Sequence, residues 1–272
     1  MGPMAEAFQP FDIVRVEERR PRRASDWAAA EAPLEVMLNG HPFSVVMRTP
    51  GADRDLTVGF LFSESVIGSA DDIQDIDAAD NVVNVVLIGE RAAGLAKVLD
   101  QRRNIVMNSS CGMCGRRTLE SLEVNAPPVA ARWTIAAETI GRLPNTLRER
   151  QQAFAETGGL HAAGLFDLKG NLEAAAEDVG RHNAVDKVLG RMLQRRRLPL
   201  QQSLLLVSGR SSFEIVQKAF LGGIPLVGAV SAPSSLAIDL ARAAGITLLG
   251  FVREGNFNIY AHEERVELSP EP

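Results

Sequence analysis

Two cysteines placed three residues apart are the side chains in this 272-residue chain best suited to covalent chemistry. Cys111 and Cys114 lie among small residues in Asn108-Ser-Ser-Cys-Gly-Met-Cys-Gly-Arg-Arg117, and the sequence has no other cysteine. Ser109 or Ser110 can begin a short helix, and a helix N-terminus with arginines nearby stabilises the nucleophilic thiolate. The glycine after each cysteine favours a loop over a packed helix. The segment therefore predicts an accessible and reactive sulfur.

Three kinds of chemistry use a cysteine pair of this spacing. A zinc site needs two further ligands, and the four histidines include no close pair, so we expect no metal site. A thioredoxin-type dithiol requires the pair at the end of the first strand of a βαβ unit, which this position does not clearly provide. A persulfide carrier uses one thiolate to hold a sulfane sulfur as Cys–S–SH, while the second thiol helps to capture or discharge it. The motif by itself does not separate these three.

A second candidate site is formed by three short polar loops, each of which follows an apolar run. The predicted strands and their loops are Leu204–Val207 with Ser208–Ser212, Leu226–Val230 with Ser231–Ser235, and Thr247–Val252 with Arg253–Asn256. The carboxyl ends of parallel strands share one edge of a sheet, where open α/β proteins bind ligands. Free backbone N–H groups, together with Arg210 and Arg253, favour an anion such as a nucleotide or pyrophosphate. Neither the Rossmann nor the P-loop glycine motif occurs.

The remaining apolar patterns predict the elements that position these sites. Asn39-Gly40 between two apolar runs predicts a tight β-hairpin, and Val82–Ile88 predicts a buried strand. The other expected elements are helices from Asp55 and over Ala92–Leu99, a hairpin of Leu160–Phe166 with Leu172–Ala176, a helix carrying Val185, Val188, Leu189 and Met192, and helices Phe213–Leu221 and Leu236–Ala244. Strands that alternate with helices in the second half predict a largely parallel sheet covered on both faces.

These elements predict an α/β protein in three parts. Residues 1–30 include the charged, proline-containing stretch Glu17–Arg23, which predicts a solvated tail. Residues 31–105 predict a small N-terminal α+β domain, and residues 106–272 predict an α/β domain that carries the cysteine loop and the three polar loops.

Composition excludes several classes of protein. The net charge of −5 argues against broad nucleic-acid binding, so we expect no nucleic-acid partner. No apolar run approaches the roughly 20 residues that span a bilayer, so we expect no membrane partner. The first seven residues lack the basic start and apolar core of a signal peptide, and we therefore expect a cytoplasmic protein.

Several linked motifs resemble those of the FdhD family of formate dehydrogenase accessory sulfurtransferases (FdhD/NarQ). The matching segments are Thr49-Pro-Gly51, Val58-Gly-Phe-Leu-Phe62, Ser109-Ser-Cys-Gly-Met-Cys-Gly115, Thr157-Gly-Gly-Leu-His-Ala162, Glu177-Asp-Val-Gly-Arg-His-Asn-Ala-Val-Asp-Lys187, Leu206-Val-Ser-Gly-Arg210 with Phe213-Glu214, Val230-Ser-Ala-Pro-Ser-Ser-Leu-Ala237 and Gly250-Phe-Val-Arg253. The resemblance covers nearly everything after about residue 30. The chain departs from the family pattern at Ala52, Arg54 and Ser65, which concerns only partner contacts of the first domain.

The resemblance implies a specific function. Proteins of this family accept sulfur from a cysteine desulfurase and pass it to molybdenum in the bis(molybdopterin guanine dinucleotide) cofactor before that cofactor enters formate dehydrogenase. It implies that Cys111 carries the persulfide, that Cys114 relays or resolves it, that the second domain resembles the cytidine-deaminase fold, and that the chain forms a homodimer. The implied cofactor-binding residues, where a GDP-like nucleotide could bind in place of the cofactor, are Phe251, Val252, Arg253, Glu254, Gly255 and Asn256, with Ser208, Gly209, Arg210, Ser211 and His182 beside them.

Some roles stay open at this stage. His161 and His182 follow glycine-rich turns and could position the cofactor, move a proton near physiological pH, or be structural. Glu177 and Asp178 with Arg181 could orient a guanine or a thiol, or form an ordinary ion pair at a helix start. An alternative for the whole protein is a non-catalytic chaperone that binds the molybdenum cofactor for formate dehydrogenase.

Overall fold

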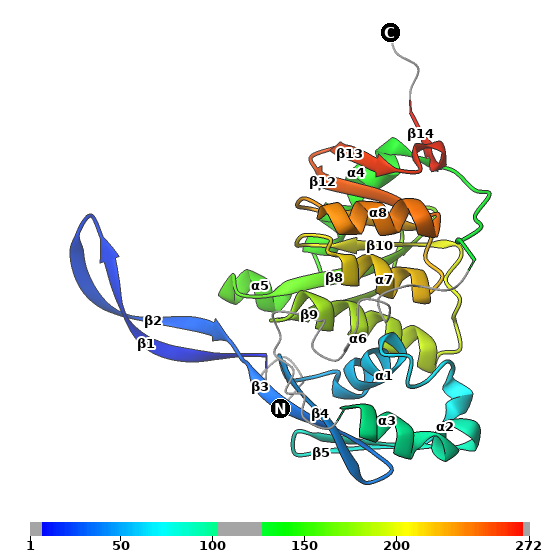
Figure 1. Ribbon diagram of the computed structural model, residues 1–272. Helices are drawn as coiled ribbons and strands as arrows, with labels where there is room; N and C mark the ends of the chain where they lie inside the picture. The colour runs from blue at the N-terminus through cyan, green and yellow to red at the C-terminus, as the bar shows by residue number, and fades with distance from the viewer. Residues whose placement is uncertain (1–6, 103–126, 269–272) are drawn as a thin grey trace.

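The first sheet is organised by the hairpin predicted at Asn39-Gly40. The computed structural model describes residues 7–102 and 127–268 (Figure 1). Asn39 and Gly40 both have positive φ, 48° and 79°, and join β3 (Ala32–Leu38) to β4 (His41–Arg48). The strand β6 (Val82–Leu87) pairs parallel to β3, and β5 (Ile73–Ala79) completes the strand order β4-β3-β6-β5. The predicted hairpin and the Val82 strand are therefore confirmed.

Three helices pack their apolar side chains with this first sheet. They are α1 (Asp53–Ser63), α2 (Gly89–Ala93) and α3 (Leu95–Arg102), and a short 3-10 helix (Ala70–Asp72) precedes β5. Leu56, Val58 and Leu61 of α1 are almost fully buried in the same cluster as the inward side chains of β3 and β6. The helix expected over Ala92–Leu99 is divided into α2 and α3 at Gly94, where the α2 helix ends. The expected domain boundary at 105–106 lies outside the described residues.

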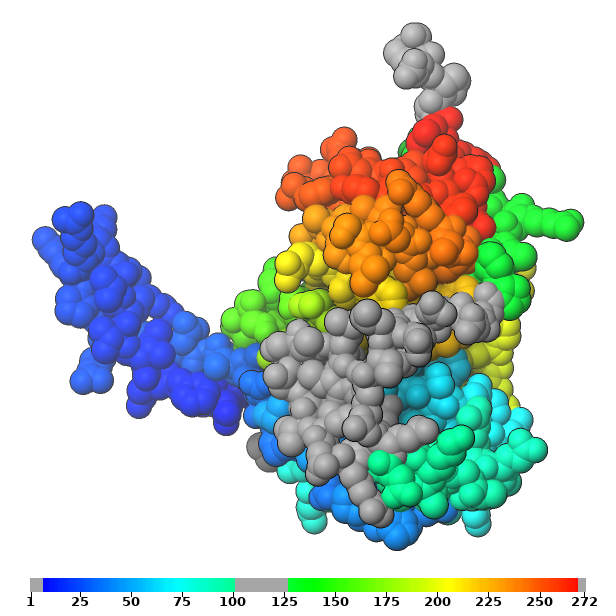
Figure 2. All heavy atoms as spheres, in the orientation of Figure 1, coloured from blue at the N-terminus to red at the C-terminus, as the bar shows by residue number. Residues whose placement is uncertain are grey.

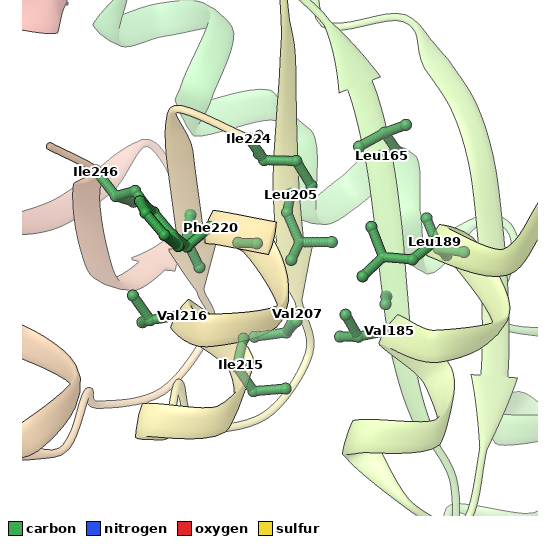
Figure 3. Close-up of a cluster of buried hydrophobic side chains, with 14 of the residues drawn as sticks. Leu165, Val185, Leu189, Leu205, Val207, Ile215, Val216, Phe220, Ile224 and Ile246 are labelled. Carbon is green, nitrogen blue, oxygen red and sulfur yellow. The ribbon is translucent and has the colours of Figure 1, made fainter. Parts of the chain in front are cut away.

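The second half of the described chain builds a six-stranded sheet in the order β13-β12-β11-β10-β8-β9. Its strands are β8 (His161–Asp167), β9 (Leu172–Asp178), β10 (Ser203–Val207), β11 (Leu226–Ala229), β12 (Thr247–Arg253) and β13 (Asn256–Ala261). One face is covered by α6 (Arg181–Gln194), α7 (Phe213–Leu221) and α8 (Ser235–Ala244), where Val185 and Leu189 pack toward Leu205 and Leu165 (Figure 3). The opposite face is covered by α4 (Ala137–Arg148). Both faces of the sheet are therefore buried, as predicted.

The prediction of a largely parallel sheet is wrong. Only β10–β11 and β11–β12 pair in parallel, whereas β8 pairs antiparallel with both β9 and β10, and β13 pairs antiparallel with β12. For β13 the cause is local: Glu254 and Gly255 have positive φ, 52° and 79°, and turn the chain directly back. The loop Arg253–Asn256 is therefore a β-hairpin turn rather than a strand-to-helix loop.

Residues 8–29 form a regular hairpin where a solvated tail was expected. The strands β1 (Phe8–Glu17) and β2 (Arg20–Ala29) pair along their whole length, and Glu18 and Arg19 form the turn at φ 49° and 68°. Three β-branched residues, Ile13, Val14 and Val16, lie in β1 and favour a strand despite the many charges. The hairpin projects from the rest of the protein, and most of its side chains are exposed (Figures 1 and 2).

The two sheets are joined by a close crossing of α1 and α6. A Cβ atom added to Gly190 of α6 would lie 2.5 Å from the backbone nitrogen of Gly59 in α1, so neither position has room for a side chain. At one end of the crossing, Arg191 Nε lies 2.9 Å from Asp55 Oδ2, and at the other Ser63 donates to Asp186 Oδ1 at 2.7 Å. The position of α6 is therefore fixed from both ends.

Shorter elements complete the described chain. They are β7 (Ile135–Ala136), α5 (Gln152–Thr157), a 3-10 helix (Glu263–Arg265) and β14 (Val266–Glu267). Among the residues described, no helix combines the length and the apolar character needed to cross a membrane.

Candidate functional site

Cys111 and Cys114 lie outside the described residues, so the structure adds nothing to the sulfur chemistry expected of them. The loops at the carboxyl edge of the second sheet can be described, and the structure brings them together. The Ser231 N–H donates to the Gly209 carbonyl at 3.3 Å, and the Ser234 N–H donates to the Ser211 carbonyl at 3.0 Å. The Phe251 N–H donates to the Ser231 carbonyl at 3.2 Å. Backbone hydrogen bonds thus connect the ends of β10, β11 and β12.

The turn after β12 extends beyond this edge and lies against α4. A Cβ atom on Gly141 of α4 would be 2.9 Å from the Gly255 Cα, which requires glycine at position 141. Arg253, Glu254 and Asn256 are exposed, and the Arg253 guanidinium carbon lies 5.9 Å from the centre of the Phe251 ring. The turn can therefore present polar groups to a ligand.

Two of the predicted binding residues, Val252 and Gly209, are needed for packing. The Val252 side chain is fully buried in the core between the sheet and α4, so a contribution of Val252 to binding is restricted to its backbone. A Cβ atom at Gly209 would lie 3.2 Å from His161 Nδ1, so this glycine makes room for the histidine. Arg210 is exposed beside it, and Ser208 accepts the Ala162 N–H at 2.8 Å through its hydroxyl oxygen.

His182 lies in the first turn of α6 and faces the first turn of α7. Its Nε2 is 3.0 Å from Ser212 Oγ and 3.4 Å from Glu214 Oε2, which indicates a proton on Nε2. Burial, followed by the positive charges of Lys218 and Arg181, lowers the pKa of His182 to about 3. The imidazole is therefore neutral near physiological pH, and a part in moving a proton, one of the roles that the sequence left open, stays a prediction.

Three of the six buried side-chain polar atoms that lack a hydrogen-bond partner in the described part of the chain lie in this region: His182 Nδ1, Ser211 Oγ and Arg181 Nε. All three belong to residues at or just before the N-termini of α6 and α7. Half-buried His161 lies close by, and burial, followed by the charge of Arg181, lowers its pKa. The predicted residues Ser211 and His182 thus share a polar region in which His182 Nδ1 and Ser211 Oγ have no partner within the described protein.

Behind His182 lies a buried ionic cluster that the sequence did not reveal. Lys218 Nζ is 2.8 Å from both carboxylate oxygens of Asp186 and 3.2 Å from Glu214 Oε1. Burial alone would lower the pKa of Lys218, but the two carboxylates raise it above its ordinary value, so Lys218 stays charged. Because Glu214 contacts both Lys218 and His182, this cluster holds the histidine in place.

Glu177 and Asp178 each make contacts that stabilise the fold, and a role in orienting a guanine or a thiol stays a prediction. Glu177 accepts the Ala153 and Phe154 N–H groups at 3.1 and 2.8 Å, and so caps the N-terminus of α5. Burial raises the pKa of Glu177. Asp178 is fully buried, 2.7 Å from Lys187 Nζ, and it also accepts the backbone N–H of Thr49 at 3.2 Å. Asp178 therefore connects the second sheet to the end of β4.

A cavity of about 520 Å³ opens at this edge, which is a typical size for a small-molecule site. The described residues that line it are Pro144, Asn145, Arg148, Gln151, Phe154, Gly158, Gly159, Leu160, His161, Ser208 and Val230. Ser208 and His161 were candidates from the sequence. The wall formed by α4 and α5 was not, because no motif in those helices points to binding.

Together these features define a mixed α/β protein with a candidate ligand site at the end of its central sheet. The chain belongs to the FdhD/NarQ family, whose family model matches residues 29–267. It is 45% identical over 280 residues to the sulfur carrier protein FdhD of Streptomyces avermitilis, covering 97% of this chain and 98% of that protein. It is 44% identical over 257 residues to the sulfur carrier protein FdhD of Sulfolobus acidocaldarius, covering 94% and 97%.

A solved structure agrees with this assignment. The crystal structure described as that of a formate dehydrogenase accessory protein from Desulfotalea psychrophila superimposes with a TM-score of 0.78. The alignment covers 96% of this chain and all of that chain, at 26% sequence identity. The family resemblance found in the sequence is therefore confirmed.

Proposed function

We propose that the protein is a sulfurtransferase that carries sulfur from a cysteine desulfurase to the molybdenum cofactor of formate dehydrogenase. The observation that carries this proposal is the CxxC pair in a chain 45% identical, over nearly its full length, to relatives named as sulfur carriers. A cysteine pair of this spacing suits transient sulfur bonding better than a structural disulfide framework.

The first step loads the protein. The Cys111 thiolate attacks the terminal sulfur of a desulfurase persulfide, so one S–S bond forms as another breaks and the desulfurase leaves as a thiolate. The exchange needs no outside oxidant or reductant.

The second step discharges the sulfur. The Cys114 thiolate attacks the Cys111 sulfur, a disulfide forms, and hydrosulfide leaves. The hydrosulfide sulfur replaces an oxygen ligand of molybdenum, and this oxygen takes the hydrosulfide proton and one proton from solvent to leave as water. A cellular dithiol then reduces the Cys111–Cys114 disulfide and restores both thiols.

The acceptor is bis(molybdopterin guanine dinucleotide), and we propose that its nucleotide ends bind at the carboxyl edge of the second sheet. Backbone N–H groups at two helix starts, together with exposed Arg210 and Arg253, suit its phosphates. A GDP-like nucleotide would bind in the same place. We further propose a cytoplasmic homodimer whose second domain is related to the cytidine-deaminase fold.

The test is the mass of the protein after incubation with cysteine and a cysteine desulfurase, followed by peptide mapping. We expect one added sulfur on Cys111 that is absent from Cys111→Ala, and no sulfuration of formate dehydrogenase by that variant. GDP affinity of Cys111→Ala should equal that of the wild type. If Cys111→Ala still supports full formate dehydrogenase activity, the carrier proposal is wrong and the non-catalytic cofactor chaperone is favoured.

A further inference from the structure

The wall that α4 and α5 contribute to the 520 Å³ cavity has the chemistry of a base-binding surface. The Arg148 guanidinium carbon lies 4.2 Å from the centre of the Phe154 ring, so a planar cation and an aromatic ring are stacked. Arg148 is exposed and Phe154 is half-buried, so the pair stays accessible beside the cavity. Aromatic rings and guanidinium planes are the surfaces on which proteins stack nucleobases.

The rest of the lining fits a heterocycle with polar edges. Asn145 and Gln151 carry side-chain amides, each of which offers both donors and an acceptor. The Ser208 hydroxyl already accepts an N–H, so its own hydrogen is available to donate. None of the described lining residues is Asp or Glu, so an anionic ligand meets no lining carboxylate there.

The position of Phe154 is set by the fold. Glu177 accepts the Phe154 N–H at 2.8 Å, and the helix ends at Gly158, whose φ of 65° turns the chain toward β8. The Gly158 N–H donates to the Phe154 carbonyl at 2.7 Å. Both ends of α5 are thus fixed around this ring, as a binding surface requires.

We propose that the Arg148–Phe154 pair stacks the planar base of a nucleotide, with the amides of Asn145 and Gln151 at the edge of the base. This inference rests on the proposed function and deepens it, because it places the base of the nucleotide on α4 and α5, while the phosphates lie toward the loops of the sheet edge. Phe154 and Arg148 are then residues that determine preference for a base-containing ligand.

The experiment is calorimetric titration of the full-length protein with GDP and, separately, with pyrophosphate. Phe154→Ala should weaken GDP binding by roughly ten- to hundred-fold, the range measured for loss of base stacking. Arg148→Lys keeps the charge but loses the plane, so it should also weaken GDP binding. Neither variant should change pyrophosphate affinity by more than about two-fold, because pyrophosphate has no base to stack. Phe11→Ala, an equivalent truncation on the projecting hairpin, is the matched control and should bind GDP as the wild type does.

Wild-type GDP affinity in both variants, or no GDP binding by the wild-type protein, would overturn the inference. An equal loss of GDP and pyrophosphate affinity would also overturn it, because the residues would then act on phosphate. The sulfur-loading test separates the two proposals. If Cys111 takes up sulfur while Phe154→Ala binds GDP normally, only the base site is wrong; if Cys111 takes up none while Phe154→Ala loses GDP affinity, the base site stands without the carrier function.

Discussion

Replacing Gly190 by alanine should push α1 and α6 apart and destabilise the protein. The added Cβ would lie 2.5 Å from the backbone nitrogen of Gly59 and closer still to the carbonyl oxygen of Asp55. Ordinary contact starts near 3.4 Å, so the two helices must separate by at least about 1 Å. Both obstructing atoms belong to the backbone, so no side-chain rotation can relieve the clash.

The size of the effect follows from two opposing contributions. Overpacking of a tight interface costs about 1–3 kcal/mol, and contact with rigid backbone places this site near the upper limit. Alanine is about 1 kcal/mol more favourable than glycine inside a helix, which offsets part of that cost. The net loss of about 2 kcal/mol corresponds to a fall in Tm of roughly 4–8 °C for a chain of this size.

The assay is thermal unfolding followed by circular dichroism, with Gly94→Ala as a matched control. At Gly94 the nearest atom to an added Cβ is the Glu90 carbonyl oxygen at 3.4 Å, an ordinary contact. The same substitution should therefore be neutral or stabilise by up to about 1 kcal/mol, through the unfolded state. If Gly190→Ala melts within 1 °C or so of the wild type, the close helix crossing is not a feature of the protein in solution.

Three further predictions concern charged groups. Lys187→Met should cost about 3–5 kcal/mol in urea unfolding because it leaves the buried Asp178 carboxylate unpaired, and an unchanged midpoint would contradict that role. Wild-type stability should fall as pH drops from 6.5 toward 3, because His182 binds a proton in the unfolded state that it does not bind in the folded state. His182→Gln should lose this pH dependence, and an identical pH profile for the two proteins would refute the burial argument. The raised pKa of Glu177 means that stability should fall as pH rises through and above 4.5, and Glu177→Gln should lack this pH dependence. Hydrogen exchange at the Phe154 amide should be faster in Glu177→Gln than in the wild type.

Local sequence patterns predicted the elements that are buried on one or both faces. The alternation of strands and helices from Leu204 to Val252 was confirmed because buried strands need continuous apolar runs and their covering helices need apolar residues at helical spacing. The Asn39-Gly40 hairpin was confirmed because few residue pairs adopt two successive positive φ angles.

The features that the sequence did not predict either bury few side chains or depend on contacts between distant residues. The projecting hairpin of residues 8–29 buries little, so its charges dominated the composition and outweighed the β-branched residues of β1. Strand β13 was missed because Asn256–Ala261 is only partly buried and carries two asparagines. The α4–α5 wall of the cavity was missed because Arg148 and Phe154 meet only when Glu177, 23 residues beyond Phe154, caps α5.

The segment from Glu177 to Lys187 shows how one motif can serve the fold and the site together. Its ends are structural, since Glu177 fixes α5 and Lys187 pairs with Asp178 at the junction of the two sheets. Its middle places His182 beside the first turn of α7, where the predicted ligand residues gather. Because both roles reside on α6 and the strand before it, a change that shifts the junction must also move the histidine. Variants at Gly190 should therefore lower nucleotide affinity as well as stability, although a side chain at position 190 would meet α1 and not the site itself.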